Sequence, residues 1–388
     1  VCKTENMKRV IILTQPLRNN YGGLLQAYAL QKVVKDLGYD VTTDSAKKWD
    51  RKDSFRFRKR LFIAQCIYPW VKGIKPVKYK EYKLIAQHTS KFVEDNLITV
   101  DFFKGKKHPK KKDVSKYDIF LVGSDQVWRK RYSTLSKYYL AFLNKENKTR
   151  IAYAASFGLD NIDEYTNDEK HIYKQLAKKF NAISVREKSG LEILKNEFGI
   201  EAEWVLDPTL LLAQEDYLKL CFKKLKARNN LSKARKIFYY VLDKSEEKRK
   251  IIDFIQNNQQ AEVFTVMPEE KFALHTTDIT KCVYPAVEEW VLAFNDCDFV
   301  ITDSFHGTVF SIIFNKPFCV VANKTRGIER LSSLLEMFGL QDRLISSEND
   351  LTEDFIANLC NIDFETINNK KELLKTKSLE FLKHALSK

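Results

Sequence analysis

The stretch that decides the fold runs from Phe299 to Pro317 and reads Phe-Val-Ile-Thr-Asp-Ser-Phe-His-Gly-Thr-Val-Phe-Ser-Ile-Ile-Phe-Asn-Lys-Pro. It opens with the apolar run 299–301, which is typical of a buried parallel strand. After Gly307 the apolar residues recur at helical spacing, and Pro317 ends the helix. A second apolar run follows at 318–321. The stretch therefore predicts a strand, a tight turn, a helix and a strand, which together make one βαβ unit.

The turn inside this unit is a candidate ligand site. In open α/β sheets, ligands lie at the carboxyl ends of the strands, where helix N-termini attract phosphate or carboxylate. Gly307 lets a ligand approach the backbone closely, and His306 can move protons near neutral pH. The plainer interpretation is a polar turn in which Ser304 caps the helix and His306 is hydrogen-bonded at the surface. We favour the site, because turns at strand ends often carry function.

Length and composition indicate a soluble globular protein of two domains. The chain has 388 residues, of which 44% are hydrophobic and 30% are charged, and this length exceeds what one hydrophobic core usually supports. The apolar run at 10–13 is too short for a signal peptide, and no stretch approaches the ~20 apolar residues of a membrane span. The 7 cysteines are scattered, which suits reduced core residues in a cytoplasmic protein.

The formal net charge of +15 leaves three kinds of partner to consider: nucleic acid, an anionic membrane surface and small anionic substrates. No nucleic-acid-binding module is recognisable, so we do not expect nucleic acid. No cluster of His, Cys or Asp has metal-ligand spacing, so we expect neither a metal nor a cofactor. We expect a cytoplasmic protein, with peripheral contact at the inner face of the membrane as an option.

The rest of the chain repeats short apolar strands and amphipathic helices, a pattern typical of parallel α/β domains. Pro208 breaks the pattern after 204–206, so we place the domain boundary there. The predicted units are a first Rossmann-like domain at 7–206, a second at 207–345 and a C-terminal helical segment at 346–388. The last helix is long enough to cross back onto the first domain.

One region, at about 45–115, does not alternate strands with helices as the rest of the chain does. It predicts a basic helical insertion in the first domain. It has helical stretches at 55–70 and 78–95, a lysine cluster at 104–112, and aromatic residues such as Trp70 interleaved with lysine. Basic residues beside aromatic ones suit an anionic membrane surface with lipid-linked acceptors. Ordinary helices and a solvated loop are an equally good interpretation.

Six stretches, in this order, resemble the polysaccharide pyruvyl transferase family over roughly residues 8–343. They are Asn20-Tyr21-Gly22-Gly23-Leu24-Leu25-Gln26-Ala27-Tyr28-Ala29-Leu30, Gly123-Ser124-Asp125-Gln126-Val127-Trp128, Tyr153-Ala154-Ala155-Ser156-Phe157-Gly158, Ser184-Val185-Arg186-Glu187, Asp207-Pro208-Thr209 and Asp303-Ser304-Phe305-His306-Gly307. The resemblance implies two Rossmann-like domains facing a cleft, the architecture called GT-B. It also implies transfer of a pyruvyl group from phosphoenolpyruvate onto two hydroxyls of a sugar, which forms a cyclic ketal.

In the family, the donor is held by arginines and by the histidine turn of the second domain. Carried over, these are Arg186 and His306, with Ser304 and Gly307 beside the donor. Some members have arginine two places before the histidine, where this chain has Ser304. Arg326 and Arg330 are therefore our candidates for the missing charge, with ordinary surface positions as the plain alternative. For Arg186 the plain alternative is an ion pair with the next residue, a glutamate.

The expected chemistry fits these residue types. Phosphoenolpyruvate carries a carboxylate and a phosphate, and arginine binds both groups with paired hydrogen bonds. We assign general acid/base catalysis to His306, with Asp303 or Asp125 as its partner. A contact to the donor phosphate is the alternative role for His306.

On the acceptor side we expect Asn20, Tyr21 and Gly22, which form the N-terminus of a predicted helix. Asp125 would accept hydrogen bonds from sugar hydroxyls, and the indole of Trp128 would stack on a sugar ring. A buried structural role is nearly as good an interpretation for Trp128.

The acceptor we expect is a surface polysaccharide or its lipid-linked precursor, and the acceptor sugar stays open. One alternative function is a GT-B glycosyltransferase that uses a nucleotide sugar, with Glu288 or Glu289 binding the ribose. Another is a non-catalytic basic adaptor.

Overall fold

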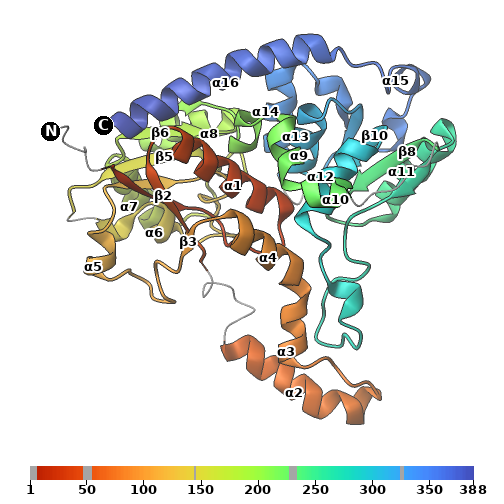
Figure 1. The fold of residues 1–388 in the computed structure, drawn as a ribbon, viewed down its shortest axis with the longest axis horizontal. Coiled ribbons are helices and arrows are strands. Elements are labelled where there is room, and N and C mark those ends of the chain that lie inside the picture. Colours follow the sequence, from red (N-terminus) through yellow and green to blue (C-terminus); the bar gives the residue numbers. More distant parts are fainter. Residues whose placement is uncertain (1–6, 47–54, 144–145, 227–233, 324–326) are drawn as a thin grey trace.

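The computed structural model describes residues 7–46, 55–143, 146–226, 234–323 and 327–388. They form two α/β domains side by side, with a long helix across both and a helical arm that projects away from them (Figure 1).

The first domain is built on a parallel sheet of seven strands in the order β3-β2-β1-β4-β5-β6-β7. The strands are β1 (Arg9–Leu13), β2 (Asp40–Asp44), β3 (Thr99–Val100), β4 (Ile119–Val122), β5 (Thr149–Ala155), β6 (Ala182–Val185) and β7 (Glu203–Trp204). Every residue of β4 is buried, as expected for a central strand covered on both faces.

The second domain has a parallel sheet of five strands in the order β12-β11-β10-β8-β9. The strands are β8 (Lys236–Tyr240), β9 (Glu262–Phe264), β10 (Phe299–Thr302), β11 (Phe318–Val321) and β12 (Leu344–Ile345). The βαβ unit expected at 299–321 is confirmed as β10, helix α13 (Phe305–Ile313) and β11. The fold class expected from the sequence, two Rossmann-like domains, is therefore confirmed.

Helices connect the strands and cover the sheets. The longer helices are α1 (Tyr21–Asp36), α2 (Phe55–Lys72), α4 (Gln87–Asn96), α7 (Asn167–Ala177), α8 (Lys188–Ile193), α9 (Gln214–Leu220), α11 (Glu246–Gln259), α12 (Val287–Asp296), α14 (Glu329–Phe338) and α16 (Phe364–Ser387). Shorter helices are α3 (Tyr79–Tyr82), η2 (Lys83–Ala86), α5 (Lys111–Val114), α6 (Leu135–Tyr138), η3 (Ala141–Leu143), η4 (Leu194–Phe198), η5 (Pro208–Leu211), α10 (Phe222–Lys226), η6 (Thr280–Cys282), η8 (Gln341–Arg343), η9 (Glu348–Asp350) and α15 (Glu353–Ala357).

The two domains share one apolar cluster across their interface. Tyr21, the first residue of α1, stacks on Trp290 of α12 with 5.6 Å between ring centroids. Phe310 of α13 packs edge-on against the same indole at 4.8 Å. Large buried aromatic contacts of this kind hold the two domains together.

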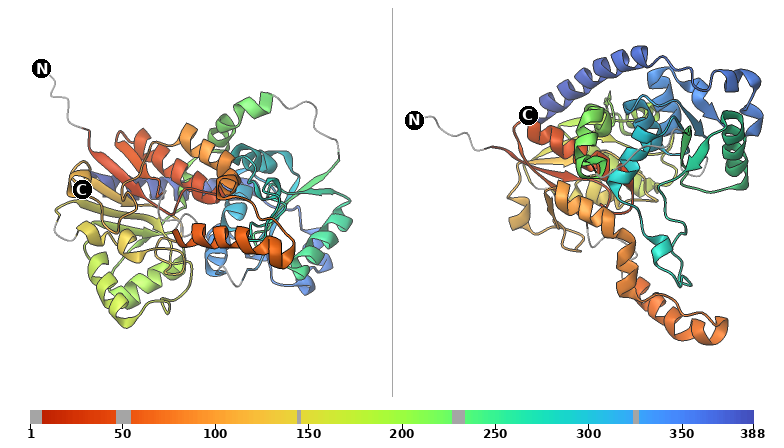
Figure 2. Two further views of the ribbon diagram at one scale, coloured as in Figure 1. Left: turned by 90° about the horizontal axis from the view of Figure 1, so that it is seen from below. Right: turned by 45° about the vertical axis from the view of Figure 1, so that its right-hand side comes forward.

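Helix α16 crosses back onto the first domain, as its length predicts (Figure 2). The hydroxyl of Ser378 accepts a hydrogen bond of 3.0 Å from the backbone N–H of Leu206. Phe381 packs on Tyr153 of β5 with 6.2 Å between ring centroids.

Only part of the stretch 45–115, which the sequence predicts to be a helical insertion, stands apart from the first domain. Residues 99–100 form β3, which pairs with β2 and belongs to the first sheet, and α4 packs against α1 and α12. A strand of two residues gives no readable pattern, which is why the sequence did not reveal it.

The part of the insertion that projects is 55–86, and it is joined by a second-domain segment near 270–284. The backbone N–H of Val77 donates to the carbonyl of Thr276 at 2.9 Å. The aromatic ring of Tyr82 packs on Phe272 at 4.8 Å. Both domains therefore contribute to the arm.

Candidate active site

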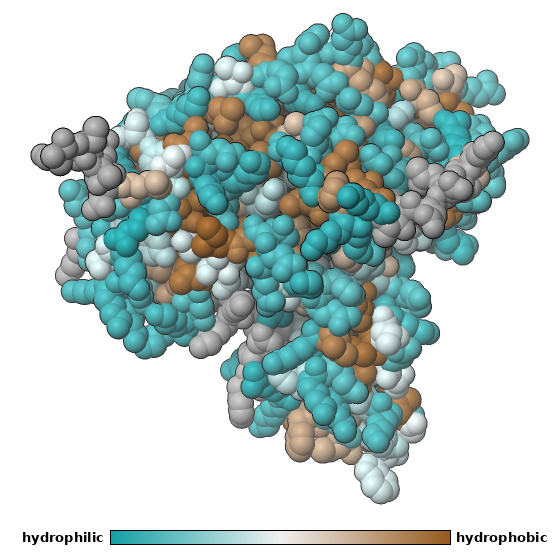
Figure 3. All heavy atoms as spheres, in the orientation of Figure 1, coloured by the Kyte–Doolittle hydropathy of each residue, from teal (hydrophilic) through white to brown (hydrophobic). Residues whose placement is uncertain are grey.

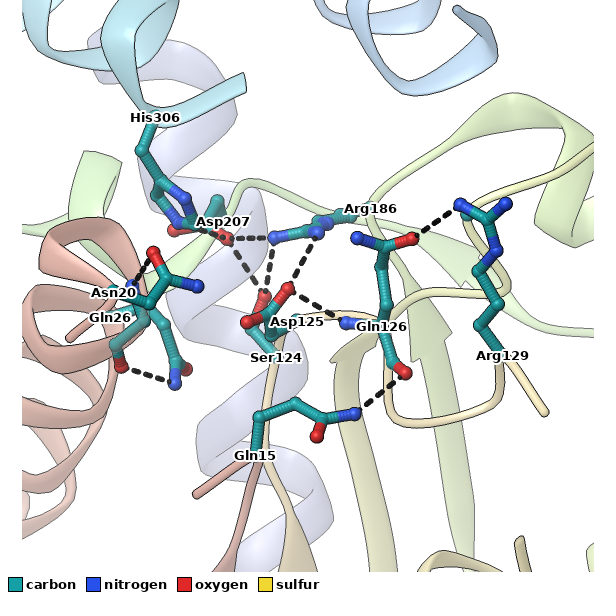
Figure 4. Close-up of polar contacts among 12 residues, drawn as sticks. Gln15, Asn20, Gln26, Ser124, Asp125, Gln126, Arg129, Arg186, Asp207 and His306 are labelled. Atoms are coloured by element: carbon teal, nitrogen blue, oxygen red, sulfur yellow. Dashed lines mark hydrogen bonds and ion pairs between the residues drawn. The ribbon is translucent and has the colours of Figure 1, made fainter. Parts of the chain in front are cut away.

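The carboxyl ends of strands from both sheets meet where the two domains touch. Asp125 follows β4, Arg186 follows β6, and Asp207 follows β7. His306 comes from the first turn of α13 in the second domain and points toward Asp207 (Figure 4). The polar turns that the sequence singles out on separate strands are thus assembled into one buried cluster.

Arg186 is the cation at the centre of this cluster. Its guanidinium donates to Asp207 at 3.0 Å, to the Ser124 hydroxyl at 3.4 Å and to Asp125 at 3.4 Å. Burial lowers its pKa, but the surrounding carboxylates outweigh burial and the net pKa is raised. The guanidinium also lies 4.3 Å from the ring of Phe305, across the domain interface. Arg186 therefore stays charged and contacts the histidine turn.

Asp207 is the carboxylate that connects Arg186 to His306. Oδ2 accepts from the Ser124 hydroxyl at 2.7 Å and lies 3.8 Å from Nε2 of His306. Oδ1 accepts from both the backbone N–H and the hydroxyl of Thr209. Burial raises the pKa of Asp207, but His306, Arg186 and Thr209 lower it by more, so the group is held as a carboxylate.

His306 is 6% exposed and lies directly against the N-terminus of α1. A Cβ atom on Gly22 would stand 2.1 Å from Cγ of His306, so only glycine fits there. Burial lowers the pKa of His306, while Asp207 opposes this shift. Nε2 has no hydrogen-bond partner among the described residues. The ring is therefore neutral near pH 7 and keeps a nitrogen for proton transfer.

Glu187 is a second buried carboxyl group at the same edge. Oε1 accepts from the backbone N–H groups of Phe157 at 2.7 Å and Gly158 at 3.1 Å. Within the described part of the chain, Oε2 has no hydrogen-bond partner. Burial raises the pKa of Glu187, although Arg186 and Arg330 oppose it. The Arg186–Glu187 ion pair, the plain alternative role for Arg186, is present but long, at 3.9 Å.

Arg330, on α14, adds a buried cation from the second domain. It is 7% exposed. Burial and the charge of Arg186 lower its pKa to about 10, against the opposing effects of Asp125 and Glu187. With a pKa of about 10 the guanidinium is still charged near pH 7, and an arriving anion would stabilise that buried charge.

Asp303 has a different role from the one expected. Its carboxylate accepts from Lys248 Nζ at 2.6 Å, from Asn323 Nδ2 at 2.9 Å and from the backbone N–H of Leu242 at 2.7 Å. These contacts tie together the loops at the carboxyl edge of the second sheet. The acid facing His306 is Asp207, from the stretch Asp207-Pro208-Thr209 that shares in the family resemblance. Asp207 thus takes the place expected for Asp303 beside His306.

Two aromatic residues expected to bind the acceptor are buried in the core. Trp128 is 0% exposed, and its indole stacks on Tyr139 with 5.2 Å between centroids. Tyr21 is 0% exposed, and its hydroxyl donates to the carbonyl of Pro285 at 2.9 Å. The sugar-stacking prediction for Trp128 is wrong in this structure, and the buried structural alternative holds. Trp128 follows the end of β4, and other residues at strand ends, such as Asp125, do face the site. Position along the chain therefore could not distinguish the buried tryptophan from them.

The other expected residues occupy the turns as follows. Asn20 caps α1 by accepting from Gly23 N–H at 3.1 Å, and Ser304 caps α13 by accepting from Gly307 N–H at 3.4 Å. A Cβ on Gly307 would lie 2.1 Å from the Thr302 hydroxyl, so this glycine serves close packing. Arg326 lies outside the described residues.

A cavity of about 740 Å³ opens beside the loop that leads into α1. Its walls combine first-domain residues with the root of the arm. The lining includes Arg18, Asn19, Arg58, Tyr79, Lys83 and Lys104. Cations, an amide and an aromatic face are the groups that bind an anionic sugar derivative.

Within the described chain, no group of three or more His, Cys, Asp and Glu side chains could hold a metal ion. None of the helices in that part is long and apolar enough to cross a bilayer.

Solved structures share this architecture. UGT89C1 from Arabidopsis thaliana, solved with UDP-L-rhamnose, aligns with a TM-score of 0.52 at 11% identity, over 98% of this chain and 99% of that one. UDP-N-acetylglucosamine 2-epimerase from Rickettsia bellii aligns with a TM-score of 0.52 at 11% identity, over 97% and 96% of the two chains. The fold is therefore that of the GT-B glycosyltransferases and related epimerases.

The family model for polysaccharide pyruvyl transferase matches residues 20–325. The chain belongs to the polysaccharide pyruvyl transferase family. No curated protein matches it significantly in sequence.

Proposed function

We propose that this protein transfers a pyruvyl group from phosphoenolpyruvate to two hydroxyls of a sugar in a surface polysaccharide or its lipid-linked precursor. The observation that carries the proposal is the buried cluster of Arg186, Asp207 and His306 at the domain interface. All three residues lie within the span that the family model matches. The cluster supplies a fixed cation and a proton-carrying imidazole side by side.

The donor is expected to bind between the two domains. Arg186 is neutralised by its carboxylates, whereas burial and the charge of Arg186 lower the pKa of Arg330 to about 10. We therefore assign the phosphate or carboxylate of the donor to Arg330, with the N-terminus of α13 as an additional source of positive potential. A guanidinium and a helix N-terminus together suit a ligand with two anionic groups.

The anion also prepares His306 for its step. A negative charge nearby favours the protonated imidazole, so donor binding raises the pKa of His306 and helps it to take up a proton. His306 then protonates the methylene carbon of the donor, which makes the neighbouring enol carbon electrophilic. One sugar hydroxyl bonds to that carbon, and the carbon–oxygen bond to phosphate breaks. The second hydroxyl then completes the ketal.

The protons balance in this sequence. Of the two hydroxyl protons lost by the sugar, one replaces the proton that His306 gave to the methyl group, and the other leaves with the phosphate. Asp207, 3.8 Å from Nε2, stabilises the imidazolium.

The acceptor is expected to enter through the cavity beside the loop that leads into α1. This assignment replaces Trp128 and Tyr21, which are buried in the core, with the arm residues around Tyr79 that line the cavity. The cationic lining suits a sugar carried on a phosphate group.

The alternative is a glycosyltransferase that uses a nucleotide sugar, which the GT-B fold also accommodates. Glu289, one of the two candidates for ribose binding, forms an ion pair with Lys224 of α10. That contact engages one of the two candidate carboxylates, and Glu288 is the other.

The two functions are separated by offering the protein each donor with a glycan acceptor. The proposal predicts phosphate release from phosphoenolpyruvate and a ketal-bearing acceptor detected by mass spectrometry. His306→Gln should abolish both products. His384→Gln, which changes an exposed side chain of α16, should leave them unchanged. Nucleotide release from a sugar nucleotide, with no heat of binding for phosphoenolpyruvate, would establish the alternative.

A further inference from the structure

The outer face of α2 is apolar and exposed. Trp70 is 90% exposed, Val71 72% and Phe62 65%, and Ile63 and Ile67 are also exposed. The helix lies in the arm that projects away from both sheets, as Figure 1 and the right view of Figure 2 show. An exposed cluster of large apolar side chains is a common mark of an interaction surface.

Helix α2 carries a buried apolar side and, away from it, exposed apolar side chains mixed with basic ones. Leu61 and Ala64 are buried and point into the small core of the arm, where Tyr82 also packs. At 100° per residue, Phe62 and Trp70 fall on the other side of the helix. Within the described part of the chain, nothing covers that second face.

The surroundings of this face are strongly basic. Residues 55–80 contain eight Arg or Lys and no Asp or Glu. Arg56, Lys59, Arg60 and Lys72 of α2 are exposed, and Figure 3 shows apolar and hydrophilic residues mixed over the arm. Lys72 lies 4.7 Å from the ring of Tyr68, as long basic side chains do when their stems cover apolar surface.

We propose that α2 docks on an anionic lipid bilayer, with Phe62, Ile63 and Trp70, which lie within about 100° of one another around the helix axis, inserted at the level of the head groups. An interfacial helix needs this combination of exposed large apolar side chains with lysine and arginine. Tryptophan favours that depth because its ring is amphipathic. A second copy of this chain fits less well, because two faces of the same high positive charge repel each other.

Docking would also place the cavity near the lipid. Arg58 and Tyr79 line the cavity, and Arg58 belongs to α2 itself. The cavity would then open close to the bilayer surface, where a lipid-linked sugar is held. This consequence rests on the proposed function, whereas the docking itself does not.

The test uses the full chain with two kinds of vesicle, pure phosphatidylcholine and phosphatidylcholine mixed with phosphatidylglycerol. We expect the protein to sediment with the second kind and to be released as salt rises, since screening weakens the attraction. Tryptophan emission should shift to shorter wavelength on binding, and Trp70→Phe should remove most of that shift.

Matched variants separate the contribution of the basic side chains to vesicle binding from that of the apolar side chains. Removing three charges by Arg56→Gln, Lys59→Gln and Arg60→Gln should lower vesicle partitioning on the order of 100-fold. The control replaces three exposed lysines of α16, on the opposite side of the molecule (Figure 1), by Gln: Lys370, Lys377 and Lys383. The control should bind nearly as well as the unchanged protein.

For the apolar part, Phe62→Ser with Trp70→Ser should abolish binding, while Leu373→Ser, at a 58% exposed site on α16, should not. All of these side chains point outward, so the variants should keep the melting temperature of the parent. The proposal would be overturned if these variants sedimented with the vesicles as well as the parent protein does. A dimer in the absence of vesicles that dissociates in the double variant would also overturn it, since the occupant would then be a second copy.

Discussion

The imidazole of His306 lies so close to Gly22 that a Cβ atom there would be 2.1 Å from its Cγ. The two residues belong to different domains, the histidine to α13 and the glycine to the first turn of α1. The position of the histidine thus depends on how the domains meet, and the candidate site is complete only when they are in contact.

Gly22→Ala should therefore displace the imidazole. Because neither backbone can easily yield, we expect a loss of unfolding free energy of about 1–3 kcal/mol and a loss of most phosphate release. Gly23→Ala is the comparison, since its new methyl group meets only the Asn20 side chain, at 3.0 Å. Urea unfolding and phosphate release measured on both variants check this. Equal activities would show that the close contact is unimportant.

Asp207→Asn removes the negative charge between Arg186 and His306. Breaking a buried ion pair on one side typically costs about 3–5 kcal/mol, and the pKa of His306 should fall further once its nearest anion is gone. We expect activity to be abolished in protein that is still folded.

A matched variant controls for that loss of stability. Asp44→Asn breaks another buried pair, with Lys137 at 2.7 Å, which does not belong to the cluster of Arg186, Asp207 and His306. It should destabilise the protein to a similar extent, as measured by urea unfolding, yet retain phosphate release. If both variants lost activity equally, Asp207 would be only structural.

The sequence predicted the strand-end turns well, because each apolar run ends where a polar residue begins, as at Arg186 and His306. It could not pair them. Asp207 follows a strand of two residues and precedes a proline, so its pattern indicated a boundary, and only the sheet order brings it beside Arg186. Burial was equally invisible from sequence: Trp128 and Asp125 belong to one turn, yet only the aspartate faces the guanidinium.

Arg330→Gln should weaken phosphoenolpyruvate binding by about 10- to 100-fold, because a hydrogen bond to a charged group contributes about 1.5–3 kcal/mol. Titration calorimetry measures this directly. Arg343→Gln is the control, since this buried arginine of the same domain donates to the carbonyls of Asn358, Leu359 and Asn361. Arg343→Gln should lower the stability of the protein without changing its affinity for phosphoenolpyruvate. If Arg343→Gln weakened binding and Arg330→Gln did not, Arg330 would not be a donor-binding residue.

The pKa of His306 links stability to pH. Its folded pKa lies below the ordinary value near 6.5, so below about pH 6.5 the unfolded chain binds a proton that the folded chain does not. The contribution of this residue is therefore fully present above pH 6.5 and decreases as the pH falls toward the folded pKa. The groups that act on the imidazole are Asp207, Arg186, Asp125 and Arg330.

The sign of this effect is tested by urea unfolding at a series of pH values. His306→Gln should lose less stability than the parent between about pH 7.5 and 5.5, while His384→Gln should follow the parent curve. Saturating phosphoenolpyruvate should reduce the difference, because a bound anion raises the pKa of His306 and lets the folded state accept the proton. A parent curve that rises as the pH falls, and flattens in His306→Gln, would mean that the folded pKa is raised and that the imidazole is already charged before the donor arrives.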